Sequence, residues 1–356
     1  MSGTAVGRWL PPFAVAAFAL GVALILAVAG PTLGYDEQAY VGAAHRLLDG
    51  TPLYDAAVSV AGGFAIYLYP PPFAVAMLPV ALLPATAGLW LWIGGLLAAF
   101  LAGVALLPVR RDVRWAIVLL AGLSWPFLYS VKLGQVGPLL FLAFAAGWRT
   151  LDRPVLLGVA IASGALVKVQ PALLLVWALA TGRRRAAAVG VGAAAAAAVL
   201  VTPFVGIGAW ADYVELLRRV STPVTTPHNF TLGAVAFQLG APESAAGILQ
   251  LAMFGATIAA TAWAWVRADA ESSYVTTVVA TQLLSPLLWD HYAMLLLLPT
   301  ALLLQRRHWW AAAIPLAGWL PAPAYPVLFL VALVAPIVTR PRTEASPATL
   351  PVPNPA

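Results

Sequence analysis

The chain has 356 residues, of which 62% are hydrophobic and only 9% are charged. Soluble domains carry roughly a quarter of charged residues, so this composition excludes a soluble globular protein and predicts one with many membrane-spanning segments. The net charge of +6 comes from short basic clusters between apolar runs. Cytoplasmic loops of membrane proteins carry such clusters, so the charge does not indicate nucleic-acid binding.

The apolar runs are continuous and do not alternate, which predicts helices rather than the strands of a barrel. Cysteine is absent, and the four histidines show no His-x-x-x-His spacing. Disulfides and a zinc site are therefore not expected. No cofactor is expected either, although Asp36 and Glu37 could hold a divalent ion together with a substrate phosphate.

The first apolar run, residues 10–30, follows Arg8. Ala27-Val28-Ala29 resembles a small-residue cleavage site, which leaves a cleaved signal peptide open. The run is long enough to cross a bilayer and many similar runs follow, so we favour an uncleaved first span.

The longest stretch without a spanning run comes next, at residues 31–70. Residues 36–49 predict an amphipathic helix on the membrane surface, with Tyr40 and Leu47 on its apolar side. Residues 67–73 hold two tyrosines and three prolines, which suit a membrane interface and cannot continue a helix.

The direction in which each remaining span crosses the membrane is assigned from the arginines beside it, which mark the cytoplasmic side. The run at 155–180 is divided at Lys168-Val169-Gln170-Pro171, because one crossing would place Arg183 opposite Arg149 and would bury a lysine in the bilayer. A short outer segment is predicted at 73–83, and further spans at 86–107, 115–131, 136–148, two within 155–180, 186–205, 248–266, 274–288, 293–304, 309–320 and 326–338.

The sequence thus predicts an all-α, polytopic transmembrane helical bundle of about twelve spans, with short interfacial helices in its outer loops and both termini in the cytoplasm. Residues 1–342 form one transmembrane domain. Residues 343–356 are rich in Pro, Ala, Ser and Thr and predict a disordered tail.

With this assigned topology, the unusual polar residues lie together at the outer face of the membrane. Their gathering there suggests a functional site at that face. Asp36 and Glu37 follow the first span directly. Asp36 is either a catalytic base or the cap of the helix that follows, and residue type alone does not separate these roles. The other candidates are Lys132, Gln135, Lys168, Arg218, Arg219, Asn229 and His291.

With these positions in order, the chain resembles a glycosyltransferase of the GT-C class. More narrowly it is similar to glycosyltransferase family 87, the polyprenyl-phosphate-mannose-dependent mannosyltransferases and related arabinofuranosyltransferases. The resemblance extends from about residue 35 to residue 300. It departs at His228-Asn229-Phe230-Thr231, where relatives more often carry Asn-Gln-Ser, which leaves the acceptor open. Its motifs are Asp36 in the first outer loop, Tyr69-Pro70-Pro71, Gly134-Gln135-Val136, Lys168-Val169-Gln170-Pro171 and residues 285–292 (SPLLWDHY).

The resemblance implies a sugar donor on a polyprenyl phosphate at the outer leaflet, a glycolipid or glycan acceptor, and direct displacement with inversion. Asp36 would be the general base, and cations would meet the leaving phosphate. From its residue type, Gln135 could bind sugar hydroxyls or could simply cap a helix. Mannose is the expected sugar and arabinofuranose is the second. No nucleotide-binding domain is visible, which fits a lipid-linked donor.

Plainer roles stay open for several candidates. Lys168 could act only as a structural residue at a helix break, Lys132 could reach toward the interface, and Arg218 and Arg219 could bind lipid head groups. A lipid or solute transporter would also place charges beside a broken helix, and a ligase that moves whole glycans would share the outer acid. The absence of repeated halves and the gathering of polar residues at one face favour the enzyme over the transporter.

Overall fold

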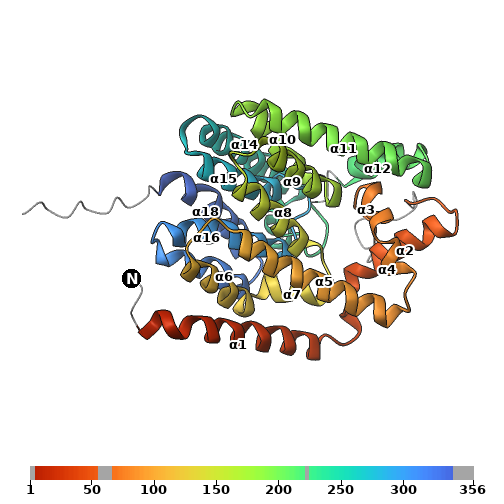
Figure 1. Ribbon diagram of the computed structural model, residues 1–356. Coiled ribbons are helices and arrows are strands. Elements are labelled where there is room, and N and C mark those ends of the chain that lie inside the picture. The colour runs from red at the N-terminus through yellow and green to blue at the C-terminus, as the bar shows by residue number, and fades with distance from the viewer. Residues whose placement is uncertain (1–4, 55–65, 221–223, 340–356) are drawn as a thin grey trace, which may run out of the picture.

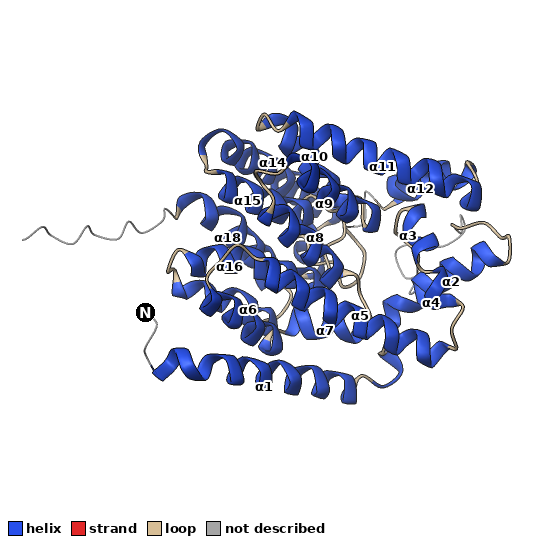
Figure 2. Cartoon of the chain, in the orientation of Figure 1, coloured by secondary structure: helices blue, strands red, loops and turns tan. Residues whose placement is uncertain are grey.

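The computed structural model describes residues 5–54, 66–220 and 224–339. Every regular element in these ranges is a helix, as Figure 2 shows, which confirms the all-α fold. The predicted disordered tail, residues 343–356, lies outside the described residues. In chain order the elements are α1 (Ala5–Val28), η1 (Gly30–Thr32), α2 (Tyr35–Leu48), α3 (Pro71–Ala76), α4 (Leu78–Ala81), α5 (Ala85–Leu106), α6 (Arg111–Leu123), α7 (Trp125–Leu133), α8 (Gly137–Arg149), α9 (Pro154–Val167), η2 (Gln170–Ala172), α10 (Leu173–Ala180), α11 (Arg184–Val205), α12 (Gly208–Arg219), α13 (Leu232–Gln238), α14 (Glu243–Arg267), α15 (Ala270–Leu283), η3 (Asp290–Leu296), α16 (Leu297–Gln305), η4 (Trp309–Ala312), α17 (Ala313–Leu316), η5 (Ala317–Trp319) and α18 (Ala324–Val338).

The helices lie side by side and give the molecule two distinct ends (Figure 1). At one end, on the right of Figure 1, lie the short helices α2, α3, α4 and α12. The start of α1 and the end of α18 both lie at the opposite end. The long helices α1 and α11 flank the bundle on two sides.

Four helices are long and apolar enough to cross a membrane: residues 8–28 of α1, and α5, α11 and α14. The bent pair α6 and α7 would make a fifth. The four helices match the predicted spans at 10–30, 86–107, 186–205 and 248–266, and the bent pair covers the one predicted at 115–131. The other predicted spans correspond to shorter or interrupted helices, so the number of about twelve stays a prediction.

The break predicted within residues 155–180 is confirmed. Helix α9 ends at Val167, a 3₁₀ turn follows at Gln170–Ala172, and α10 begins at Leu173. Pro171 lies inside that turn, and a proline cannot continue the hydrogen bonding of α9.

Two predicted spans were wrong in detail. Residues 115–131 do not form one helix, because α6 ends at Leu123 and α7 leaves at a bend of 67°. Pro126 in the first turn of α7 has no N–H to continue α6. Residues 309–320 likewise form the short turns η4, α17 and η5 in place of a continuous helix.

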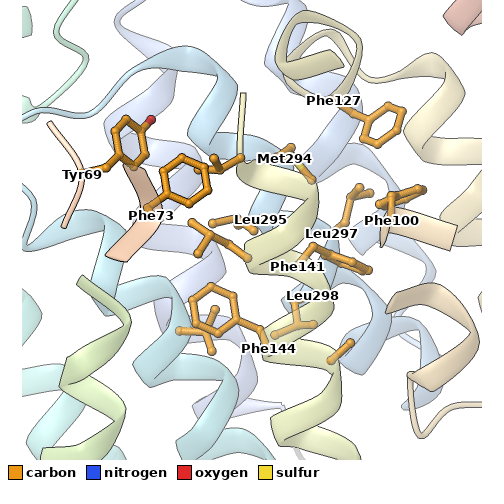
Figure 3. Packing of buried hydrophobic residues seen from close by; sticks show 14 of the residues in the cluster. Tyr69, Phe73, Phe100, Phe127, Phe141, Phe144, Met294, Leu295, Leu297 and Leu298 are labelled. Carbon is orange, nitrogen blue, oxygen red and sulfur yellow. The ribbon is translucent and has the colours of Figure 1, made fainter. Parts of the chain in front are cut away.

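The core is made of aromatic and aliphatic side chains from helices far apart in the sequence. Phe100 of α5, Phe127 of α7 and Phe141 of α8 pack together, with ring centroids 4.4 and 5.1 Å from Phe100. Leu297 and Leu298 of α16 lie against this group (Figure 3). Helix α15 is buried at every residue from Ser272 to Leu283, so it forms the centre of the bundle.

A buried arginine closes the end that is remote from α2. One terminal nitrogen of Arg306 donates to both carboxylate oxygens of Asp269 at 3.0 and 3.1 Å. The other donates to the carbonyls of Pro336 and Thr339 at the end of α18. Asp269 also caps α15 through the N–H of Ser272. These bonds join α15, α16 and α18 at one point.

Helix α1 packs closely on α6 through two glycines. A Cβ atom on Gly122 would lie 2.5 Å from the Cα of Phe18 in α1, and backbone atoms cannot move aside as a flexible side chain can. The glycine therefore sets the distance between the two helices.

We predict that Gly122→Ala destabilises the protein by ~1–3 kcal/mol, because it overpacks a backbone contact. Gly94→Ala in α5 is the matched control, since a Cβ there meets nothing within 4 Å. Alanine is also the better helix former by about 1 kcal/mol. Thermal unfolding in one detergent compares the two, and equal melting temperatures would contradict the close packing.

Candidate functional site

Asp36 is positioned by the first turn of α2. Gly34 occupies the cap position with φ +71°, and no side chain makes a cap hydrogen bond there. The N–H of Gly34 donates to the carbonyl of Lys132 at 2.9 Å, which fastens the start of α2 to the end of α7. Asp36 is the second residue of the helix and does not cap it, so the plainer of its two expected roles is wrong.

The charges around Asp36 come from segments far apart in the sequence. Asp36 interacts electrostatically with His291 and Lys168, which favour its charged form, and with Asp290, which opposes it. Burial is the larger effect and raises the pKa of the Asp36 carboxyl above its usual value. The side chain stays partly exposed, so this desolvated acid remains accessible.

Lys168 lies at the break between α9 and η2 and is only 6% exposed. Its ammonium group donates to the hydroxyl of Tyr292 and lies 5.7 Å from the ring centroid of Tyr69. Burial lowers the pKa of Lys168 to about 7, although the charge of Asp36 works against this shift. The lysine is thus held among aromatic rings with a carboxylate as its nearest counter-charge.

A chain of hydrogen bonds lies behind this pair. The hydroxyl of Tyr40 donates to that of Tyr69 at 2.9 Å, and the amide of Gln135 donates to Tyr69 at 3.3 Å. The amide oxygen of Gln135 accepts from the N–H of Gly137 at 2.6 Å. Gln135 therefore orients Tyr69. The expectation that Tyr67 and Tyr69 lie at an interface was wrong, because both are buried in the core.

His291 is the second residue of η3 and is 4% exposed, yet neither ring nitrogen has a hydrogen-bond partner among the described residues. Its Nδ1 lies 3.6 Å from Oδ1 of Asp290, which is an electrostatic contact longer than a hydrogen bond. The rings of Trp289 and Tyr292 lie beside it, with centroids 5.8 and 4.9 Å away. A buried polar ring without partners is costly, so its nitrogens are suited to meet another molecule.

Glu37 and Lys132 lie close to the start of α2 without joining this group of charges. Glu37 is buried, with its Cβ against Gly134, and burial raises the pKa of its carboxyl. The ammonium of Lys132 lies over the ring of Tyr129 at 5.4 Å from the centroid.

Arg218 and Arg219 end helix α12, where both are exposed. Arg218 lies 3.6 Å from Glu215 in an ion pair, with 78% of its side chain exposed. The charges that act on Asp36 are those of His291, Lys168 and Asp290, so a role for the two arginines in the site stays a prediction.

Asn229 has a different position from the one expected of a substrate ligand. Its amide donates to the carbonyl of Pro286 at 3.0 Å, and its oxygen accepts from the N–H groups of Thr231 and Leu288. The residue is fully buried. It therefore fastens the loop before α13 to the segment that leads into His291.

Sequence reasoning missed Trp125, whose indole N–H donates to Oδ2 of Asp290 at 3.0 Å. It also assigned Tyr40 and Tyr292 no contact with the lysine or with Tyr69. Pro126, directly after Trp125, signals an interrupted helix. That interruption was the sequence feature that could have drawn attention to Trp125.

The assembled site offers one partly accessible, desolvated carboxylate next to two buried nitrogen bases. Such a set can take a proton at Asp36 and can stabilise an anion at Lys168 and His291. Asp36 and Asp290 are the carboxylates of this group that could meet a cation. No group of three or more His, Cys, Asp or Glu side chains is placed to hold a metal ion in the part of the chain that the structure describes.

Comparison with known families gives one match. The family described as Glycosyltransferase family 87 matches residues 67–288, which is more than half of the chain. This range contains Gln135, Lys168 and Asn229, whereas Asp36 lies before its start and His291 lies after its end. The curated proteins and the solved structures gave no match.

We predict that Asn229→Ala lowers thermal stability substantially, because it leaves buried groups of Thr231, Pro286 and Leu288 without their partner at ~1–3 kcal/mol each. Gln238→Ala is the control, since Gln238 gives one hydrogen bond to the carbonyl of Asn229 in the same loop. Thermal unfolding of both variants tests this role, which would be wrong if they were equally stable.

Proposed function

The chain belongs to glycosyltransferase family 87 and is a membrane glycosyltransferase, and we propose that it moves a mannosyl residue from polyprenyl-phosphate-mannose to a glycolipid or glycan acceptor. The observation that carries the proposal is the convergence of Asp36 with Lys168 and His291. An acid that takes a proton and cations that receive a phosphate are what this transfer requires.

In the proposed reaction the acceptor hydroxyl gives its proton to Asp36. Its oxygen attacks the anomeric carbon from the face opposite the phosphate, so the new glycosidic bond has inverted configuration. The bond from the anomeric carbon to the phosphate oxygen breaks, and both of its electrons leave with the polyprenyl phosphate. Lys168 and His291 stabilise the negative charge of that leaving group.

We place this site at the outer face of the membrane, with both termini in the cytoplasm and about twelve crossings in total. Two features support the orientation. The basic residues Arg110 and Arg306 lie together near Gln305 at the end remote from Asp36, and cytoplasmic ends carry such residues. The start of α1 and the end of α18 lie at that same end (Figure 1).

Polyprenyl-phosphate-arabinofuranose is the second candidate donor. The charges around Asp36 would serve either sugar, because both donors leave the same phosphate. Transfer from each of the two labelled donors is therefore measured in the same membranes.

We predict that Asp36→Asn lowers transfer of labelled mannose from polyprenyl-phosphate-mannose to endogenous lipid acceptors by ~10²–10⁴-fold, since asparagine cannot accept the proton. The assay uses membranes with equal amounts of each protein. Glu37→Gln is the matched control, because it also neutralises a buried acid of α2, and it should change transfer far less.

If the Asp36→Asn variant still transfers the sugar, Asp36 is not the general base. If the normal protein transfers only arabinofuranose, the donor assignment is wrong but the mechanism stands. If it transfers neither sugar, the proposed function fails and transport becomes the better account.

The reaction should also show a bell-shaped dependence of kcat/KM on pH. Burial raises the pKa of Asp36, so activity is lost as pH falls through a value above the ordinary ~3.9 of aspartate. Lys168 has a pKa of about 7, so phosphate stabilisation is lost as pH rises through that region. Lys168→Arg should move the upper limb to higher pH, because guanidinium stays charged. An unchanged upper limb would exclude Lys168 as the titrating group.

A further inference from the structure

The bend between α6 and α7 brings a tryptophan to the histidine of the site. Trp125 is the first residue of α7, and α7 packs directly on η3. Its ring is stacked on Tyr129 at 4.9 Å and lies 5.3 Å from the tilted ring of Trp319, so two aromatic side chains hold the indole in place. From this position its N–H donates to Oδ2 of Asp290 at 3.0 Å.

The two carboxylate oxygens of Asp290 contact different residues. Oδ2 accepts from Trp125, whereas Oδ1 accepts from the backbone N–H of His291 at 2.8 Å and lies 3.6 Å from Nδ1 of the same residue. Two hydrogen bonds therefore fix the carboxylate plane. A fixed carboxylate next to Nδ1 favours a proton on that nitrogen, since no described residue bonds the other ring nitrogen.

We propose that Trp125 and Asp290 are positioning residues that hold His291 with its proton on Nδ1 and its Nε2 free for the substrate phosphate. This inference rests on the proposed function for the identity of that phosphate. The groups that face the imidazole are the carboxylates of Asp290 and Asp36 and the rings of Trp289, Tyr292 and Tyr129. The charged groups of this set are both carboxylates. Nε2 binds a phosphate oxygen through a proton between them, which either the phosphate carries or the ring has taken up.

A double-mutant cycle tests whether Trp125 acts through His291. Trp125→Phe keeps the stacked ring and removes the N–H, and it should lower kcat by about tenfold, the effect of losing one hydrogen bond to a charged group. In a His291→Gln background the same change should lower kcat by less than about twofold, because the residue through which it acts is gone.

Trp319→Phe is the matched control. Trp319 lies in the same aromatic stack, but its N–H donates to the carbonyl of Leu123, so activity should stay unchanged. The proposal is overturned if Trp319→Phe costs as much as Trp125→Phe. It is also overturned if Trp125→Phe costs the same with and without His291, which would mark a purely structural role.

A second measurement does not depend on any substrate. In protein labelled with ¹⁵N-histidine, the spectrum of the neutral ring reports which nitrogen carries the proton, and His291→Gln identifies the signal among the four histidines. We expect Nδ1–H in the normal protein and a shift toward Nε2–H in Asp290→Ala. An Nε2–H ring in the normal protein would overturn the inference, even if no sugar transfer were found. If the normal protein shows the expected histidine spectrum but transfers no sugar, only the proposed function is refuted.

Discussion

A carboxylate and an ammonium group withdrawn from water must lie near each other, and this constraint organises the molecule. A lone buried ion costs several kcal/mol, whereas Asp36 and Lys168 each favour the charged form of the other. Their mutual attraction requires the start of α2 to meet the break after α9, with η3 completing the group. The surrounding helices then serve to hold three short segments in one place.

The site is built where helices are interrupted. Uninterrupted helices satisfy their own backbone and can present apolar surface to lipid, as α5, α11 and α14 do with their exposed faces. The polar groups instead follow the turn at Gly34, the bend before Trp125 and the break at Lys168. Each interruption frees the chain to aim a side chain inward, and prolines at 126 and 171 make two of them obligatory.

The two ends of the bundle treat their buried charges differently. Both terminal nitrogens of Arg306 donate to fixed protein acceptors, two carbonyls and the carboxylate of Asp269, which suits a permanent fastening. The ring of His291 is equally buried and has no hydrogen-bond partner among the described residues. A fully paired ion stabilises one structure, whereas ring nitrogens that no described residue bonds can meet a ligand. This difference separates the fastening of α15, α16 and α18 from the chemistry beside α2.

The sequence by itself determined the helical membrane class, most element positions and the break at Lys168, because apolar length, proline and arginine clusters are local signals. It also singled out Asp36, Lys168 and His291. Only the tertiary structure decided that these three meet, since their distance depends on how the helices pack. The same holds for the bend at Trp125, the hydrogen bonds of Gln135 and Asn229, and the burial of Tyr69. A side chain's partners come from residues as many as 196 positions away, and no local pattern specifies such a contact.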